Sequence, residues 1–212
     1  MKIGNMQPIR IAVLISGGGT TLDNLVQEIN KGGLLAKIVQ VISSNNKAIG
    51  NEKAVRYGIP FQLIERKNFQ NLEEFSSSIF QTISEKNIDL ICLGGFLQKL
   101  RIPQEYENRI MNIHPSLLPA FGGKGMYGHH VHEAVIHHGV KITGCTVHFV
   151  NNEYDQGPII IQRAVPVSDN DTADSLARKV FHEECIAYPE AIKAYANQDL
   201  KIIGRKVIRV SS

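Results

Sequence analysis

Cysteine is scarce in this chain, which has three cysteines in 212 residues. They are odd in number, widely spaced, and no two of them form a CxxC pair. This pattern argues against the disulfide framework of a small secreted domain. We therefore expect Cys92, Cys145 and Cys185 to be reduced, buried thiols.

Long apolar runs are missing as well. The longest run near the start, residues 11–15, is far shorter than the roughly 20 residues that span a bilayer, and residues 1–10 lack the layout of a signal peptide. Hydrophobic residues make up 43% of the chain and charged residues 20%, which is ordinary for a globular protein and unlike a disordered one. We expect a cytoplasmic protein with no membrane partner.

A strong excess of one charge is also absent, because the formal net charge is only +3. Lysines and arginines are scattered and are not interleaved with aromatic residues, so we expect no nucleic-acid partner. Small anionic ligands remain compatible with this balance. The chain has no internal repeat, low-complexity tract or obvious linker, and its length is enough for a large core. We predict one domain over residues 1–212, acting as a monomer or a homodimer.

What the chain does contain is an alternation of short β-branched runs with helix-like segments, which is typical of parallel βαβ units. The first half is predicted to hold strands at 9–16, 36–42 and 88–93 and helices at 21–31, 49–57 and 68–85. The second half is predicted to hold strands at 143–150 and 158–167, a helix at 172–196 and a terminal hairpin at 201–210. Asn68 and Asp171 are the expected N-caps of the third and last helices.

Glycine and proline crowd into the stretch after Leu93, which therefore predicts loops. The residues concerned are Gly94, Gly95, Pro103, Pro115, Pro119, Gly122, Gly123, Gly125 and Gly128. Loops held on a rigid scaffold commonly carry function. We therefore look for the functional site in this region.

A glycine-rich turn, ISGGGTTLDNL at 15–25, joins the first strand to the first helix. Glycines let the backbone approach an anion closely, and a helix N-terminus offers free N–H groups, so a phosphate site is predicted. A dinucleotide site is disfavoured, because Leu22 replaces the third glycine and residues 43–46 supply no acid for a ribose. A Walker loop is also disfavoured, since no lysine closes the turn. The alternative is a tight turn without a ligand.

Histidines are dense at one place, where five occur within ten residues: His129, His130, His132, His137 and His138. Imidazole is a common metal ligand. The spacing argues against a metal, because neither HExxH nor a Cys/His pairing is present, and His130 and His132 point in different directions on a helix. We expect no metal, and histidines that are exposed or lie in polar loops.

Asn112 and His114 lie in NIHPSLLPAFGG, residues 112–123, directly after an apolar run. Pro115 biases His114 toward extended geometry, and Pro119 does the same for the residue before it, so a rigid loop is expected. Asp155 precedes a glycine and a proline in a turn between two predicted strands. Each residue taken alone is explained as an ordinary turn or loop residue.

The motifs together resemble the phosphoribosylglycinamide formyltransferases, the folate-dependent enzymes of purine synthesis, over residues 9–193. The resemblance rests on five segments: ISGGGTTL from 15, LGGFLQKL at 93–100, MNIHPSLLPAF at 111–121, GCTVHFVNNEYDQGPIIIQ at 144–162 and HEECIAYPEAI at 182–192. It implies an α/β fold with a mostly parallel, Rossmann-like sheet, helices on both faces and antiparallel additions in the C-terminal half. It also implies transfer of a formyl group from 10-formyltetrahydrofolate to glycinamide ribonucleotide, without a metal.

The resemblance assigns a catalytic role to three residues. Asn112 would donate to the oxyanion of the tetrahedral intermediate, a contact whose loss in acyl transfer costs about 2.7 to 4 kcal/mol. His114, expected to be cationic, would act as general acid. Asp155 would raise the pKa of His114 and order a water for proton relay.

By the same resemblance, two further groups of residues bind the substrates. Gly19, Thr20 and Thr21 would hold the ribonucleotide phosphate, and Glu184 would contact the substrate near its amine. The folate would be bound by Leu97, Gln98, Lys99, Leu100 and Asn112. Some relatives have arginine in place of Gln98, which puts contacts to the folate glutamate tail in question.

Three alternatives stay open. A formyltetrahydrofolate hydrolase and a formyltransferase acting on methionyl-tRNA share the Asn-His-Asp chemistry. Both usually add a second domain, for which 212 residues leave no room. A non-enzymatic nucleotide-binding or metal-binding module is the third, and it would require Asn112, His114 and Asp155 to come together by chance.

Overall fold

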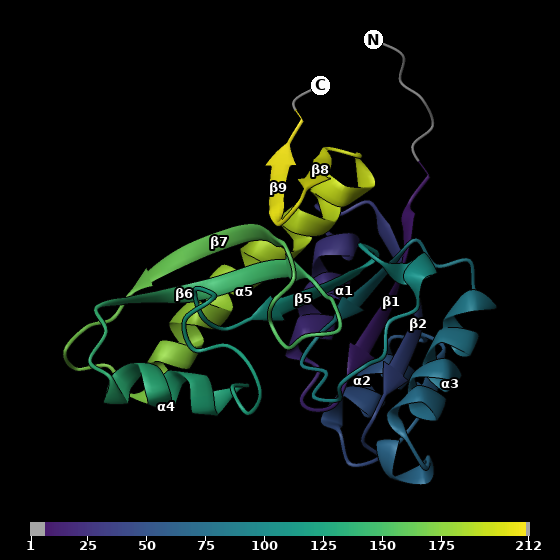
Figure 1. The fold of residues 1–212 in the computed structure, drawn as a ribbon, viewed down its shortest axis with the longest axis horizontal. Helices are drawn as coiled ribbons and strands as arrows, with labels where there is room; N and C mark the ends of the chain where they lie inside the picture. The colour runs from purple at the N-terminus through teal and green to yellow at the C-terminus, as the bar shows by residue number, and fades with distance from the viewer. Residues whose placement is uncertain (1–6, 211–212) are drawn as a thin grey trace.

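A computed structural model of the protein describes residues 7–210 (Figure 1). The N-terminal stretch considered for a signal peptide, and the outermost ends of the domain predicted over 1–212, therefore lie partly outside the described residues. The described chain forms one sheet of nine strands in the order β3-β2-β1-β4-β5-β6-β7-β9-β8.

The first five strands of the chain are parallel to one another. They are β1 (Ile9–Ile15), β2 (Ala36–Ser43), β3 (Phe61–Leu63), β4 (Leu90–Leu93) and β5 (Ile110–His114). β1 lies between β2 and β4, so the chain order reverses there. Such a switch point opens a crevice at the carboxyl ends of the strands, which is where ligands bind in open α/β sheets.

Helices cover both faces of the sheet (Figure 1). Residues of β1 alternate between the faces: Ile11 and Val13 belong to the core under α1 (Thr20–Asn30) and α5 (Ala173–Ala196), whereas Leu14 packs under α3 (Leu72–Ser84). The remaining helices are α2 (Ile49–Arg56), α4 (His129–His137) and two 3₁₀ turns at Arg66–Asn68 and Gln104–Tyr106.

The C-terminal half extends the sheet with antiparallel strands. β6 (Ile142–Phe149) pairs with β5 and with β7 (Ile159–Pro166) in antiparallel fashion. β9 (Lys206–Arg209) pairs with β7 in parallel and forms the expected terminal hairpin with β8 (Leu200–Ile203). The mostly parallel sheet with helices on both faces and antiparallel C-terminal additions confirms the fold class predicted from the sequence.

Both predicted N-caps are wrong, the first by three residues and the second by one. The side chain of Asn71 caps α3 by accepting from the Glu74 N–H at 2.8 Å, whereas Asn68 ends the preceding 3₁₀ turn. Thr172 caps α5 in a reciprocal capping box, and Asp171 instead accepts from the hydroxyl of Ser175, the box's other member. In each case two capping residue types lie close together, and the sequence does not distinguish them.

The region predicted as loops contains a strand and a helix. β5 escapes prediction because its five residues include two polar side chains, although Met111 and Ile113 are buried. α4 escapes prediction because four of its nine residues are histidines, which are weak helix formers, although Val131 and Val135 are buried at the four-residue spacing of one helix face. The histidines of α4 therefore lie on a helix, and His132 is buried.

Two further expectations concern burial and membranes. Cys92 and Cys145 are buried free thiols as expected, but Cys185 is only half-buried, so the prediction for that residue is wrong. Within residues 7–210, no helix combines the length and the apolar character needed to cross a membrane.

Candidate active site

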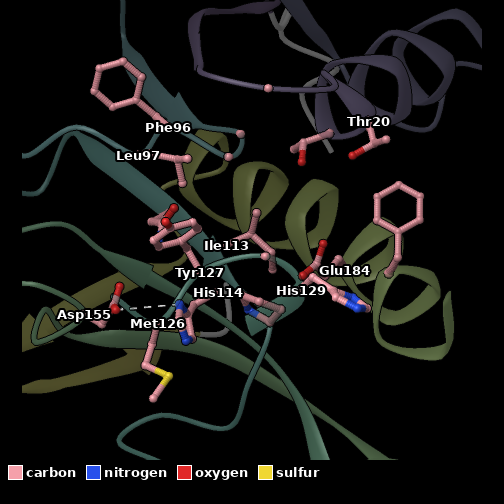
Figure 2. Close-up of a pocket in the computed structure, with 18 of the residues that line it drawn as sticks. Thr20, Phe96, Leu97, Ile113, His114, Met126, Tyr127, His129, Asp155 and Glu184 are labelled. Carbon is pink, nitrogen blue, oxygen red and sulfur yellow. Dashed lines mark ion pairs between the residues drawn. The ribbon is translucent and has the colours of Figure 1, made fainter. Parts of the chain in front are cut away.

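A cavity of about 640 Å³ opens at the carboxyl ends of the parallel strands (Figure 2). The glycine turn after β1 and the loop after β4 form one side, and the end of β5 forms its floor. Residues 123–129, Asp155 and the inner face of α5 complete the wall. A smaller cavity of about 80 Å³ adjoins it and shares Phe96, Asn112, Tyr154 and Asp155.

All the site residues predicted from the sequence line these two cavities. Gly19, Thr20, Thr21, Leu97, Asn112, His114, Asp155 and Glu184 line the larger one. Gln98, Lys99, Leu100, Asn112 and Asp155 line the smaller one. The structure therefore brings together residues that are separated by up to 165 positions in the chain.

His114 and Asp155 approach each other directly in the cavity wall, as the dashed line in Figure 2 shows. The distance between His114 Nδ1 and Asp155 Oδ2 is 3.7 Å, and the two side chains are 4% and 12% exposed. His114 Nε2 lies 2.8 Å from the carbonyl oxygen of Phe121. Because a carbonyl only accepts, Nε2 must carry the hydrogen, and the network thereby assigns the tautomer. Nδ1 is then the nitrogen that is free to exchange a proton.

The chain after His114 is held against the antiparallel strands. The Thr146 hydroxyl on β6 accepts from the Leu118 N–H at 3.0 Å and donates to the Ser116 carbonyl at 2.6 Å. The Gln162 amide on β7 donates to the Leu118 carbonyl at 3.0 Å. This loop carries the Phe121 carbonyl that fixes the His114 ring, so the bonds hold the imidazole in one orientation.

His148 is a site residue that the sequence analysis does not identify. It lies opposite Asn112 in the pairing of β5 and β6, and its side chain is 2% exposed. Its Nδ1–H donates to the Phe149 carbonyl at 2.8 Å, so Nε2 can accept from the Asn112 amide, 3.2 Å away. One Asn112 hydrogen is then engaged, and the second is left for a ligand. In the sequence, the one feature that could have pointed to His148 is its place in the segment GCTVHFV, residues 144–150.

Asp155 occupies a strained turn between β6 and β7. Its φ of 53° lies in the left-handed region, which is uncommon for a residue other than glycine. Its Oδ2 accepts from the Gly123 N–H at 2.8 Å. Two residues later, a Cβ on Gly157 would collide with the Phe149 carbonyl, so glycine is required for this close approach. The turn thus aims the Asp155 carboxylate at the two buried imidazoles.

The charge states follow from burial and from these neighbours. Burial lowers the pKa of His114 and outweighs Asp155 and the Phe121 carbonyl, which act to raise it. The pKa of His114 is thus lowered, whereas the sequence predicts a raised pKa and a cationic ring. His114 is therefore neutral near pH 7 before ligands bind. Burial acts to raise the pKa of Asp155, but His148, His114 and the Gly123 N–H together lower it. Asp155 is therefore ionised.

The glycine turn presents the N-terminus of α1 to the cavity. Gly19 has a φ of 68°, and no side chain caps the helix, so the first N–H groups remain available. A Cβ on Gly19 would lie 2.7 Å from Gly50 Cα at the start of α2. Lys53 is close by and pairs with Asp23 at 2.5 Å. Backbone donors and the helix dipole make this end of the cavity suitable for an anion.

Glu184 lies on α5 and lines the same cavity. No hydrogen bond or ion pair of its carboxyl group occurs within the described part of the chain, and burial raises its pKa to about 7. A carboxyl group with this pKa exists in both protonation states near neutral pH. It can therefore either donate to a ligand or accept from one.

The loop after β4 is fixed to the glycine turn. The Leu97 N–H donates to the Ser16 hydroxyl at 2.9 Å, and the Ser16 N–H donates to the Gly95 carbonyl at 3.0 Å. Leu97 is 47% exposed and lies at the cavity rim, whereas Leu100 is buried. An exposed apolar side chain close to a buried one suits a flat ring system.

The histidines of α4 do not assemble a metal centre with their neighbours. Across residues 7–210, no cluster of three histidine, cysteine or acidic side chains has a geometry that could hold a metal ion. His129 and His130 at the start of α4 instead approach Glu133 at 3.6 Å and 3.2 Å. The expected independence from metal stays a prediction.

Comparisons with known proteins agree with this geometry. The family model described as formyl transferase matches residues 9–192. A trifunctional purine biosynthetic protein adenosine-3 of Gallus gallus is 41% identical over 92% of this chain, which spans only 19% of that relative. A chloroplastic phosphoribosylglycinamide formyltransferase of Arabidopsis thaliana is 36% identical over 91% of this chain and 67% of its own.

Solved structures give the same result. Glycinamide ribonucleotide transformylase 1 from Symbiobacterium toebii matches with a TM-score of 0.91 at 38% identity, over all of this chain and 98% of its own. A phosphoribosylglycinamide formyltransferase from Coxiella burnetii matches with a TM-score of 0.88 at 35% identity, over 96% and 94% of the two chains. The chain therefore belongs to the formyl transferase family and, within it, to the phosphoribosylglycinamide formyltransferases.

Proposed function

We propose that this protein transfers the formyl group of 10-formyltetrahydrofolate to the amine of glycinamide ribonucleotide. The observation that carries the proposal is the convergence of Asn112, His114 and Asp155 in one cavity with an uncapped glycine turn. The first three suit acyl transfer to an amine, and the turn suits a phosphate. Neither feature alone would select this reaction.

In the proposed reaction the substrate amine attacks the formyl carbon and forms a tetrahedral oxyanion. The free hydrogen of the Asn112 amide donates to that oxygen. Asn112 is held by His148, so little reorganisation is needed as charge develops. The bond between the formyl carbon and the folate nitrogen then breaks, and the folate nitrogen gains a proton while the amine loses one.

His114 is suited to carry that proton in both directions. In the free structure its Nδ1 is unprotonated, so it can accept a proton from the attacking amine and return it to the departing folate nitrogen. The cation formed in between faces the ionised Asp155 at 3.7 Å. The ionised Asp155 stabilises this cation, and no net proton is consumed.

The substrates are proposed to enter from two sides. The ribonucleotide phosphate would bind Gly19, Thr20 and Thr21, with Glu184 contacting the substrate near its amine. The folate ring would lie against the segment from Leu97 to Leu100, with Asn112 between both substrates. The shared lining of the two cavities supports this arrangement, because the formyl group must reach the amine at their junction.

The runner-up is a formyltetrahydrofolate hydrolase. A formyltetrahydrofolate deformylase from Pseudomonas syringae shares the fold at 24% identity, which says nothing about activity. The uncapped glycine turn favours the transferase, because a hydrolase that uses water as the acceptor does not need a phosphate site. We also propose that residues 1–212 act as one domain in the cytoplasm, as a monomer or homodimer. No nucleic acid is proposed to take part.

Purified protein should convert 10-formyltetrahydrofolate to tetrahydrofolate only when glycinamide ribonucleotide is present. Folate conversion is followed by absorbance, in parallel reactions with and without the ribonucleotide, and with and without a chelator. Activity that survives chelation is expected. Loss of activity on chelation would contradict the metal-free mechanism, and equal turnover without the ribonucleotide would indicate the hydrolase.

A further inference from the structure

His132 is a polar residue of the cavity to which the proposed reaction gives no role. It lies on α4, is 5% exposed and lines the larger cavity. Its Nδ1 is buried and has no hydrogen-bond partner among the residues that the structure describes. The other such side chains in that range, Asn51 and Thr143, do not line the cavity.

An unpaired polar atom in this position calls for an explanation. Buried nitrogen and oxygen atoms are nearly always paired, because losing water without a replacement is unfavourable. His132 is one of the buried residues of α4 and also lines the cavity. The described residues give neither nitrogen of His132 a hydrogen-bond partner, and the side chain lines the cavity, so a ligand bound there is one source of a partner.

The chemistry of the ring limits what that partner can be. Burial, with the nearby His129 and His114, lowers the pKa of His132 to about 4, so the ring is neutral at physiological pH. A neutral imidazole offers one donor and one acceptor. It matches a hydroxyl or an amide group, and as an uncharged ring it is poorly suited to a phosphate.

The position of His132 indicates which of the two substrates it contacts. It belongs to the cavity that contains the glycine turn and Glu184, and it does not line the smaller cavity beside Gln98 and Lys99. His114 at the reacting centre is one of its electrostatic neighbours. His132 therefore lies on the ribonucleotide side, near the part of that substrate that joins the phosphate to the amine.

We propose that His132 is a binding residue for the uncharged sugar and glycinamide portion of the ribonucleotide. This inference rests on the proposed function. The contact gives the imidazole a hydrogen-bond partner when substrate is present, and it orients the substrate between the phosphate turn and the proposed catalytic residues. One neutral hydrogen bond lost from a bound ligand predicts about a tenfold weaker affinity.

The test compares His132→Phe and His132→Asn with the wild type. The phenylalanine variant fills the same volume without a hydrogen bond, and the asparagine variant restores a polar group near the position of Nδ1. His137→Phe is the matched control, because it makes the same change at an exposed histidine of α4 that does not line the cavity. KM is measured separately for the ribonucleotide and for 10-formyltetrahydrofolate, and binding of inorganic phosphate and of ribose 5-phosphate is measured by calorimetry.

For His132→Phe we expect the KM of the ribonucleotide to rise about tenfold, with the folate KM and the phosphate affinity unchanged. His132→Asn should recover part of the loss, and His137→Phe should match the wild type. Weaker ribose 5-phosphate binding would assign the contact to the sugar, and unchanged binding would assign it to the glycinamide group. Equal changes in both KM values, or no change, would overturn the inference. Failure of the proposed function is a separate result, because the wild type itself would then be inactive.

Discussion

Replacing Asp155 by asparagine removes one charge from the site and keeps the shape of the side chain. The amide oxygen can still accept from the Gly123 N–H, so the turn should fold as before. What is lost is the attraction between the carboxylate and a protonated His114 at 3.7 Å. At an effective dielectric constant of about 20, such a pair contributes about 4 kcal/mol as an upper bound.

Because about 1.4 kcal/mol corresponds to a tenfold change in rate, the loss predicts a fall in kcat between about 100-fold and about 1000-fold. The His114 pKa should fall further, since its neighbour that most raises it is gone. The acidic limb of the pH-rate profile should therefore move to lower pH. Single-turnover measurements of tetrahydrofolate formation, with both substrates saturating, report this change directly.

Asp174→Asn provides a matched control. Asp174 approaches His129 at 3.8 Å, but its side chain is 79% exposed, so solvent screens the pair and the rate should stay within about twofold of the wild type. Thermal denaturation checks that both variants are folded. If Asp155→Asn kept wild-type kcat while remaining folded, the proposed role of its charge would be refuted.

Four further results are expected. Asn112→Ala should lower kcat by about 100-fold to 1000-fold, because the oxyanion loses its amide donor, and a smaller effect in a saturated rate assay would argue against that role. Gly19→Ala places a Cβ 2.7 Å from Gly50 Cα at a positive φ, so it should raise the KM of the ribonucleotide much more than that of the folate; equal effects would count against a local phosphate site. Gln98→Ala should change mainly the KM of the folate, and a fall in kcat alone would contradict its placement beside that substrate. The fold lowers the pKa of His132 from an ordinary 6.5 to about 4, so between these pH values the unfolded chain binds a proton that the folded chain does not. The free energy of unfolding should therefore fall by up to about 3 kcal/mol as the pH drops from about 6.5 to about 4. Urea titrations of His132→Phe should lack this part of the pH dependence.

Much of the fold is predictable because its signals are local. The glycine turn, the apolar stripe of α3 and the alternation of strands and helices are read within short windows. β5 and α4 are exceptions, and β5 lies in the middle of the sheet with β4 and β6 on either side. The two polar residues of β5 weaken the sequence pattern of a strand, and tertiary packing stabilises the strand in spite of them.

The proposed catalytic residues are found through motifs, but their charge states are not. The net pKa of His114 depends on how deeply the fold buries it, and no sequence window carries that information. The role of His148 depends on the register of β5 against β6, which places it opposite Asn112. The unpaired nitrogen of His132 likewise becomes visible only when every neighbour in space is known.

The central claim is that Asn112, His114 and Asp155 move a formyl group onto an amine bound at the glycine turn. The most direct test supplies 10-formyltetrahydrofolate labelled with carbon-13 in the formyl group, together with glycinamide ribonucleotide, and follows the label by NMR. The account predicts that the label appears in the formylated ribonucleotide in a one-to-one ratio with tetrahydrofolate. Label recovered as free formate, with the ribonucleotide unchanged, would contradict it.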